Sequence, residues 1–246
     1  MNSFLKDLLR RLLGPKHIIW ARKNFASSAS LFFSNNLPAL AAIYGTDKEA
    51  RHKYTQYYQE HFNKRRKARL NILEIGVGGY ESSTTGGASL RMWKRYFPHS
   101  KIYGIDIFDK SPLQEDRIYI YQGSQDDEQF LRKVVASIGH IDIIIDDGSH
   151  INSHVIKSFE ILFPLLNEGG IYVIEDLQTA YCPRFEGKLY SNEVGVTSIE
   201  FLKDRVDGLN YKHFLIPEYE PSYFDRYITS IHFYCNICFI YKGCYT

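Results

Sequence analysis

The segment from Ile141 to Ile145 constrains the fold most strongly, because four of its five residues are isoleucine. A short, nearly continuous apolar run predicts a strand that is covered on both faces, as in a parallel sheet. Strand-like and helix-like patterns alternate on either side of it. The strands expected are 70–75, 101–105, 117–122 and 171–174, and the helices are 89–97, 127–137 and 154–166. This alternation predicts a doubly wound α/β sheet with helices on both faces.

The C-terminal part of the chain changes to a β-rich pattern. Residues 228–234 and 237–241 are two such runs, and Cys235-Asn236 joins them. So short a connection predicts a hairpin, which makes one strand antiparallel to the rest. We therefore expect a mostly parallel seven-stranded sheet, closed by an antiparallel hairpin, in residues 66–246. Residues 1–65 are expected to form a mainly helical N-terminal extension.

Charge and cysteine content argue against two classes of protein. The 246 residues carry a net charge of +2 at pH 7, far from the concentrated positive charge of a nucleic-acid-binding protein. Three of the four cysteines lie near the C-terminus, and no secretory signal precedes them. A disulfide framework is therefore not expected, and a cytoplasmic location is.

Residues 4–13 predict a basic amphipathic helix. Leucines recur there every four residues from Leu5, with Lys6, Arg10 and Arg11 beside them, and Gly14-Pro15 ends the pattern. Such a helix either lies on an anionic membrane surface or packs on its own chain or a second subunit. Peripheral membrane contact and a homo-oligomer both stay open at this point.

A glycine-rich turn closes the first strand, in Glu74-Ile75-Gly76-Val77-Gly78-Gly79. Glycines there allow a ligand to approach the backbone at the carboxyl end of a strand. The turn is not a dinucleotide fingerprint, because the third glycine of that motif would fall at Glu81. Its acid two residues before the first glycine instead resembles the E/D-x-G-x-G motif of class I methyltransferases. The plainer alternative is an ordinary strand-to-helix turn.

Two further positions extend this candidate cofactor site. Asp106 ends the next strand, where an acid binds both ribose hydroxyls of a nucleoside; the alternative is that it caps the following turn. After the third strand, methyltransferases often carry an acid that binds the adenine amino group, and this chain has Ser124 at that position. We expect Ser124 or Gln125 to serve instead, or Asp126 to reach the base.

Acidic residues follow the two buried strands, in Asp146-Asp147-Gly148-Ser149-His150 and in Glu175-Asp176. Because parallel strands end at the same edge of a sheet, four carboxylates and an imidazole should gather above the cofactor crevice. Their mutual repulsion favours a bound cation, and oxygen ligands favour Mg²⁺ over zinc. The alternative is that the acids cap helices and pair on the surface. His150 can accept a proton near neutral pH, or it is a structural or capping residue.

Taken together, these motifs resemble the macrocin and mycinamicin family of sugar O-methyltransferases. The resemblance rests on Tyr44 to Lys48, Leu73 to Tyr80, Asp106 to Lys110, Asp146 to His150 and Ile174 to Thr179. It implies S-adenosylmethionine as the methyl donor, Mg²⁺ held by Asp147, Glu175 and Asp176, and His150 as general base. The acceptor it implies is a sugar hydroxyl of a glycosylated natural product or glycan.

Two rival functions remain at this point. One is an NAD-linked sugar oxidoreductase or epimerase, against which the missing third glycine and the paired acids count. The other is a non-catalytic partner protein that keeps the methyltransferase fold. The complete set of acids and His150 counts against that second rival.

Overall fold

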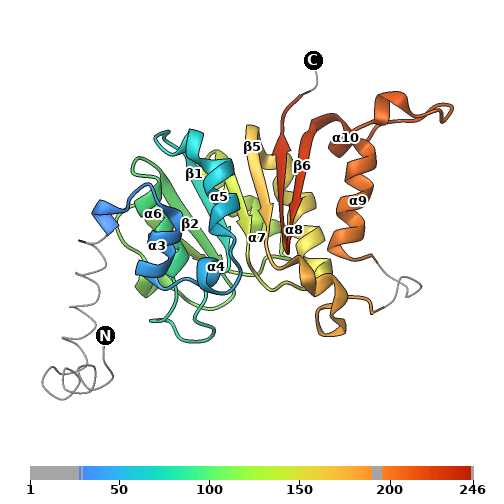
Figure 1. Ribbon diagram of the computed structural model, residues 1–246. Helices are drawn as coiled ribbons and strands as arrows, with labels where there is room; N and C mark the ends of the chain where they lie inside the picture. The colour runs from blue at the N-terminus through green and yellow to red at the C-terminus, as the bar shows by residue number, and fades with distance from the viewer. Residues whose placement is uncertain (1–27, 29, 190–195, 245–246) are drawn as a thin grey trace, which may run out of the picture.

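A computed structural model describes residues 28, 30–189 and 196–244, and it confirms the predicted fold class (Figure 1). Seven strands form one sheet in the order β3-β2-β1-β4-β5-β7-β6. Only the pairs β5–β7 and β6–β7 are antiparallel. The strands are β1 (Asn71–Ile75), β2 (Lys101–Asp106), β3 (Ile118–Gln122), β4 (Ile141–Asp146), β5 (Leu166–Ile174), β6 (Ile228–Tyr234) and β7 (Ile237–Lys242).

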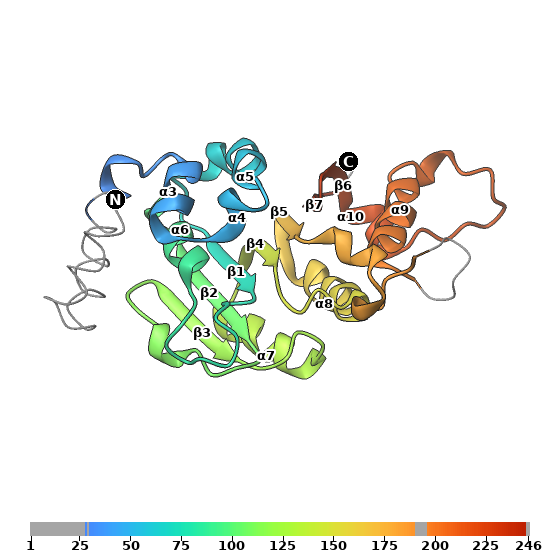
Figure 2. The ribbon, with the colours of Figure 1, turned by 60° about the horizontal axis from the view of Figure 1, so that its bottom comes forward.

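Helices cover both faces of the sheet, and Figure 2 shows α3 to α5 on the opposite side of the strands from α7 and α8. The helices are α3 (Leu37–Tyr44), α4 (Asp47–Ala50), α5 (Thr55–Phe62), α6 (Ala88–Tyr96), α7 (Glu128–Ile138), α8 (Asn152–Leu165), α9 (Ser198–Gly208) and α10 (Tyr223–Tyr227). Short 3₁₀ turns lie at Asn63–Arg65, Ser111–Leu113, Leu177–Tyr181, Pro183–Phe185 and Tyr211–His213.

The alternation of side chains along each strand divides the buried residues into two cores. On one face, Ile143 and Ile145 of β4 pack with α3, α5 and α6. On the other face, Ile144 packs with α7, α8 and α9. A strand buried in both cores must be apolar throughout, which is why the isoleucine run of β4 was informative. The central position of β4 between β1 and β5 follows from the same burial.

The helices before residue 65 share a core with the sheet. Leu37, Leu40 and Tyr58 are fully buried against residues of β1, β4 and β7. Thr46 caps α4 by accepting a hydrogen bond from the backbone N–H of Lys48, while Glu49 accepts one from Thr55. Thr46 therefore begins α4. The division of the chain at residue 65 stays a prediction.

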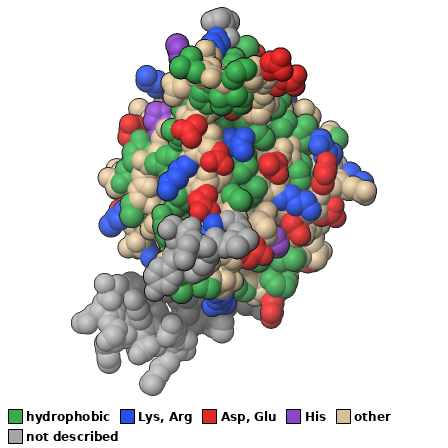
Figure 3. Space-filling model, turned by 90° about the vertical axis from the view of Figure 1, so that its right-hand side faces the viewer, with side chains coloured by type: hydrophobic (Ala, Val, Ile, Leu, Met, Phe, Trp, Pro, Cys, Tyr) green, Lys and Arg blue, Asp and Glu red, His purple; other side chains and the backbone are tan. Residues whose placement is uncertain are grey.

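No helix within the described ranges is long and apolar enough to cross a membrane. The predicted amphipathic helix at residues 4–13 lies outside the described residues. On the face that Figure 3 shows, acidic and basic side chains are interspersed.

His61 attaches α5 to the C-terminal hairpin. Its two ring nitrogens lie 2.7 Å from the hydroxyl of Tyr241 and 3.0 Å from that of Tyr234, and its ring stacks on Phe239 with centroids 4.0 Å apart. Burial, with help from the nearby His232, lowers the pKa of His61 to about 4, against a small opposing effect of Glu60. The folded protein therefore holds this imidazole neutral.

We predict that His61 makes the free energy of unfolding decrease as the pH falls below its ordinary pKa. The folded pKa lies below the ordinary value, so its contribution is complete above pH ~6.5 and is lost as the pH falls toward about 4. His61→Gln keeps polar groups for both tyrosines but does not titrate. Urea unfolding should show that the free energy of unfolding of the wild type falls by about 1 kcal/mol more than that of this variant between pH ~6.5 and about 4. The figure is reduced because the imidazole is only half-buried. His99→Gln, at an exposed site, is the control, and parallel curves for wild type and His61→Gln would contradict the prediction.

Candidate active site

The strand register brings the two acidic motifs together at one edge of the sheet. Ile75 of β1 pairs with Asp146 of β4, which pairs with Ile174 of β5. The register continues one residue further, because the N–H of Asp147 donates to the carbonyl of Ile75 (3.0 Å) and that of Glu175 donates to Asp146 (3.0 Å). The side chains after β4 and β5 therefore start from neighbouring backbone positions.

Asp147, His150 and Asp176 converge there. One candidate ligand atom from each lies within 4.8 Å of the others. Within the described part of the chain, these three residues are the set of His, Cys, Asp or Glu side chains close enough to hold one metal ion. Nε2 of His150 is 3.9 Å from Oδ1 of Asp147 and 3.6 Å from Oδ2 of Asp176. All three side chains are partly exposed. The predicted base and two of the predicted metal ligands thus share one small site.

Two of these residues have a backbone conformation that side chains usually avoid. The φ angles are +58° at His150 and +55° at Asp176, both in the left-handed region. This region costs energy for residues other than glycine, although Asp and His tolerate it better than most. Strain of this kind persists where the surrounding structure imposes it and is concentrated at functional sites. The conformation supports a positional role for both side chains.

Lys48 provides a positive charge to the same group of acids. Its fully buried Nζ lies 2.6 Å from Oε1 of Glu175, 2.7 Å from Oδ2 of Asp147 and 3.2 Å from Oε1 of Glu74. Burial alone would lower the pKa of Lys48, but the carboxylates, with Asp147 foremost, outweigh it and raise that pKa well above its ordinary value. The side chain is therefore a permanent cation within the site.

Two tyrosines and a histidine from the same N-terminal segment bind the acids as well. Tyr58 donates a hydrogen bond to Oε1 of Glu175, and Tyr54 donates one to Oδ1 of Asp176 at 2.8 Å. Nδ1 of His52 lies 3.4 Å from that same Asp176 oxygen. These partners could not be predicted from the sequence, because their acids are more than 100 residues away in the chain. The one available signal was Lys48, at the end of a segment that carried the family resemblance.

Asp146 does not join this cluster, which corrects the expected gathering. Its carboxylate is buried on the α8 side of the sheet, where it accepts hydrogen bonds from Ser158 (2.6 Å) and Gln125 (3.2 Å). Adjacent residues of a strand point to opposite faces, so Asp146 and Asp147 separate. Glu74 completes the group instead. Burial raises the pKa of Glu74 to about 7, despite the opposing charge of Lys48.

The glycine turn packs closely on the acidic loop. A Cβ at Gly76, where φ is +94°, would lie 2.0 Å from the carbonyl oxygen of Asp147, so a glycine is required there. A Cβ at Gly78 would meet nothing within 4 Å, which leaves open space above that backbone. Beneath the turn, the carboxylate of Glu74 accepts a hydrogen bond from Nε1 of Trp93 at 3.1 Å.

Asp106 lies beside this turn at the end of β2. Its two oxygens accept hydrogen bonds from the backbone N–H groups of Val77 (3.0 Å) and Phe108 (2.9 Å). The side chain thus fixes the glycine turn and caps the turn that follows β2, as the alternative interpretation proposed. Each carboxylate oxygen accepts more than one hydrogen bond, so this arrangement is compatible with ribose binding as well.

The three candidates for adenine recognition occupy different environments. Gln125 is buried, and its amide bonds Asp146 on one side and the N–H of Ser149 (2.7 Å) on the other. A side chain with both ends bonded inside the protein serves to fix the loops. Ser124 donates to the carboxylate of Asp126, which is partly exposed and lies 3.7 Å from Nε2 of His154. Asp126 is therefore the candidate that offers a partly exposed carboxylate.

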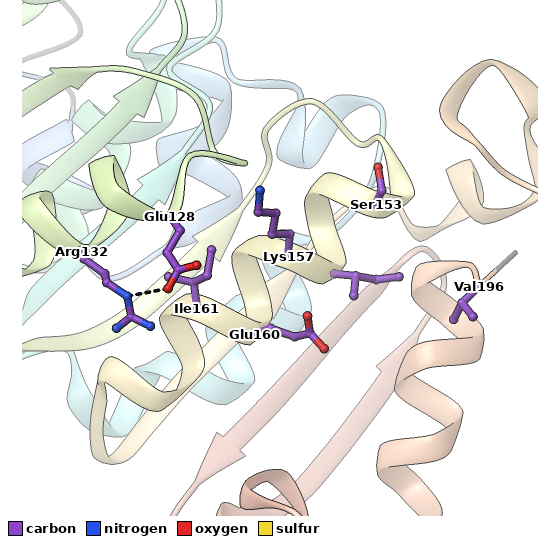
Figure 4. A pocket seen from close by; sticks show the side chains of 8 residues that line it. Glu128, Arg132, Ser153, Lys157, Glu160, Ile161 and Val196 are labelled. Atoms are coloured by element: carbon purple, nitrogen blue, oxygen red, sulfur yellow. Dashed lines mark hydrogen bonds and ion pairs between the residues drawn. The ribbon is translucent and has the colours of Figure 1, made fainter.

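A separate groove lies outside this site, between α7 and α8 (Figure 4). Its volume is about 610 Å³, and Glu128 and Arg132, which form an ion pair at 2.8 Å, lie at one side of it. Its other lining residues are Ser153, Ile156, Lys157, Glu160, Ile161 and Val196. None of the candidate site residues lines this groove.

Comparison with known proteins gives the class of fold. No protein-family model matches the chain. The structure aligns with the MycE methyltransferase from the mycinamycin biosynthetic pathway, in complex with Mg and SAH, with a TM-score of 0.82 and 45% identity. That alignment covers 85% of this chain and 54% of MycE. The sheet order and hairpin are those of a class I O-methyltransferase fold, as predicted.

Curated relatives agree with this comparison. The chain is 46% identical, over 207 residues, to the 8-demethyl-8-alpha-L-rhamnosyl tetracenomycin-C 2'-O-methyltransferase of Streptomyces olivaceus, covering 84% of this chain and 54% of that enzyme. It is 45% identical over 210 residues to the mycinamicin VI 2''-O-methyltransferase of Micromonospora griseorubida, and that alignment covers 85% of this chain and 53% of that enzyme. The resemblance to antibiotic sugar O-methyltransferases is confirmed, and the chain spans about half the length of these relatives.

Proposed function

We propose that this chain transfers a methyl group from S-adenosylmethionine to a sugar hydroxyl, with Mg²⁺ bound beside the acceptor. The observation that carries the proposal is the convergence of Asp147, His150 and Asp176 next to a glycine turn and Asp106. Sugar O-methyltransferases share 45–46% identity with this chain, and the matched MycE structure contains Mg and SAH. The acceptor class we propose is a glycosylated natural product or glycan.

The residues present fit a hard divalent cation. Carboxylate oxygens of Asp147 and Asp176 lie close together and partly exposed, which suits Mg²⁺. Glu175 is buried and does not belong to this group, and both Lys48 and Tyr58 contact its Oε1. We propose its Oε2 as the third ligand. When bound, the cation would lower the pKa of a coordinated hydroxyl.

The cofactor would lie along the glycine turn. We assign Gly76 and Gly78 to the close approach of backbone and cofactor, and Asp106 to the ribose hydroxyls. Glu74 and Gln125 are buried, so we assign them to the support of the two loops from below. Ser124 and Asp126 remain the proposed partners of the adenine.

His150 is the group we assign to proton removal. Its Nε2 faces Asp147 and Asp176, so an acceptor hydroxyl near these acids would also be near the imidazole. Asp176 in turn is held by Tyr54 and His52. The protein's own contribution is thus alignment of the hydroxyl and acceptance of its proton.

We predict methyl transfer from radiolabelled S-adenosylmethionine to a rhamnosylated acceptor such as 8-demethyl-8-alpha-L-rhamnosyl tetracenomycin C in the presence of Mg²⁺. EDTA should abolish turnover, and added Mg²⁺ should restore it, because the acids without a cation do not activate the hydroxyl. SAH binding, measured by calorimetry, should survive chelation. Full turnover in EDTA, with metal content checked, would contradict the metal's role. Stabilisation in a thermal shift by NAD and not by SAH would favour an oxidoreductase instead.

We also predict that His150→Ala lowers kcat by about 10²- to 10⁴-fold, the usual effect of losing a positioned general base. Mn²⁺ and SAH affinities should change little, because neither requires the imidazole. His140→Ala is the matched control, since His140 is exposed and precedes β4 at the opposite end of that strand. A fully active but destabilised His150→Ala would show that His150 is a structural residue.

A further inference from the structure

Lys48 touches three acids of the site, more than any other side chain described above. Its ammonium bridges Asp147 and Glu175, at 2.7 and 2.6 Å, and also reaches Glu74. Asp147 directly follows β4, Glu175 directly follows β5, and Glu74 is the last residue but one of β1. One cation therefore connects all the strands on which the metal site is built.

Lys48 contacts one oxygen of the Asp147 carboxylate and one oxygen of the Glu175 carboxylate. Lys48 binds Oδ2 of Asp147, and Oδ1 is the oxygen that faces His150. Lys48 and Tyr58 bind Oε1 of Glu175, which leaves Oε2 as its second oxygen. Lys48 thus holds Asp147 through Oδ2 and Glu175 through Oε1.

The lysine is itself rigidly held. Its side chain is 1% exposed, so the ammonium has no exit to solvent. Its backbone N–H donates to the hydroxyl of Thr46 (3.4 Å), and its carbonyl accepts from the N–H of Tyr54 (2.8 Å). Gly45, with φ at +76°, ends α3 and begins the turn that leads into this segment. The backbone around Lys48 thus fixes where its charge lies.

We propose that Lys48 is a positioning residue that orients Asp147 and Glu175 as metal ligands. The inference rests on the proposed function, because it gives those two acids their role. Without the cation, the neighbouring carboxylates repel each other and lose the partner that sets their rotamers. Hydrogen-bonded partners of metal ligands typically contribute about 10- to 100-fold to metal affinity, and Lys48 is such a partner for two ligands at once.

The test compares Lys48 with another buried lysine. Lys242 is 7% exposed, and its ammonium donates to the backbone carbonyls of Phe163, Pro164 and Leu166, far from the acids. Lys242→Met therefore reproduces the loss of stability on removing a buried lysine. Mn²⁺ binding is measured by electron paramagnetic resonance for wild type, Lys48→Met, Lys48→Gln and Lys242→Met, with melting curves for all four.

We expect both Lys48 variants to bind Mn²⁺ at least about 10-fold more weakly than wild type, while Lys242→Met binds as wild type does. In turnover, the Mg²⁺ concentration for half-maximal activity should rise similarly, and saturating Mg²⁺ should recover most of kcat. Lys48→Gln keeps a polar group that can donate hydrogen bonds but carries no charge, and it decides the outcome if Lys48→Met does not fold.

Two results would overturn the inference. If the folded Lys48 variants bind Mn²⁺ with wild-type affinity, the lysine is only structural. If they bind it more tightly, the ammonium competes with the metal instead of preparing its site. Failure of the wild type itself to bind Mn²⁺ would instead contradict the proposed function, so the two failures are distinguishable.

Discussion

The contact between one buried ammonium and three carboxylates is the interaction on which the site depends. Glu74, Asp147 and Glu175 surround Nζ of Lys48 within 3.2 Å. Charges of one sign do not gather in a protein interior without compensation, because burial removes the water that would stabilise them. Lys48 provides that compensation from a helix that is distant in sequence. The N-terminal helices are therefore part of the site as well as of the core.

The sheet explains why these acids meet and a fourth one does not. Parallel pairing of β1, β4 and β5 places three strand ends side by side, and the glycine turn after β1 lies against the loop after β4. Because side chains alternate along a strand, Asp147 faces the α3–α5 side, where Lys48 lies. Asp146 instead faces α8, where Ser158 and Gln125 satisfy its carboxylate. One acid thus supports the loops while the next enters the site.

Much of the fold followed from the sequence, because it depends on local patterns. The isoleucine run, the alternating helices and the C-terminal hairpin predicted every strand of the sheet, although β5 begins at Leu166 and not at Ile171, since Leu166 pairs with Ile141 across a register shift. The positions of Asp147 and Asp176 also followed, because strand ends of a parallel sheet share an edge. The partners Lys48, Tyr54 and Tyr58 did not follow. Their contacts depend on how α4 and α5 pack over the sheet, which no spacing in the sequence encodes. The same holds for Gln125, whose burial between two loops appears only in three dimensions.

The most direct test of this account is anomalous diffraction from crystals grown with Mn²⁺ and SAH. The account predicts a single manganese peak among the carboxylates of Asp147, Glu175 and Asp176, with SAH along the glycine turn and Lys48 still bound to Asp147 and Glu175. A structure with SAH in place but no manganese at these acids would contradict the proposed metal site. A peak at the position of the Lys48 ammonium, with the lysine displaced, would contradict the central role given to that side chain.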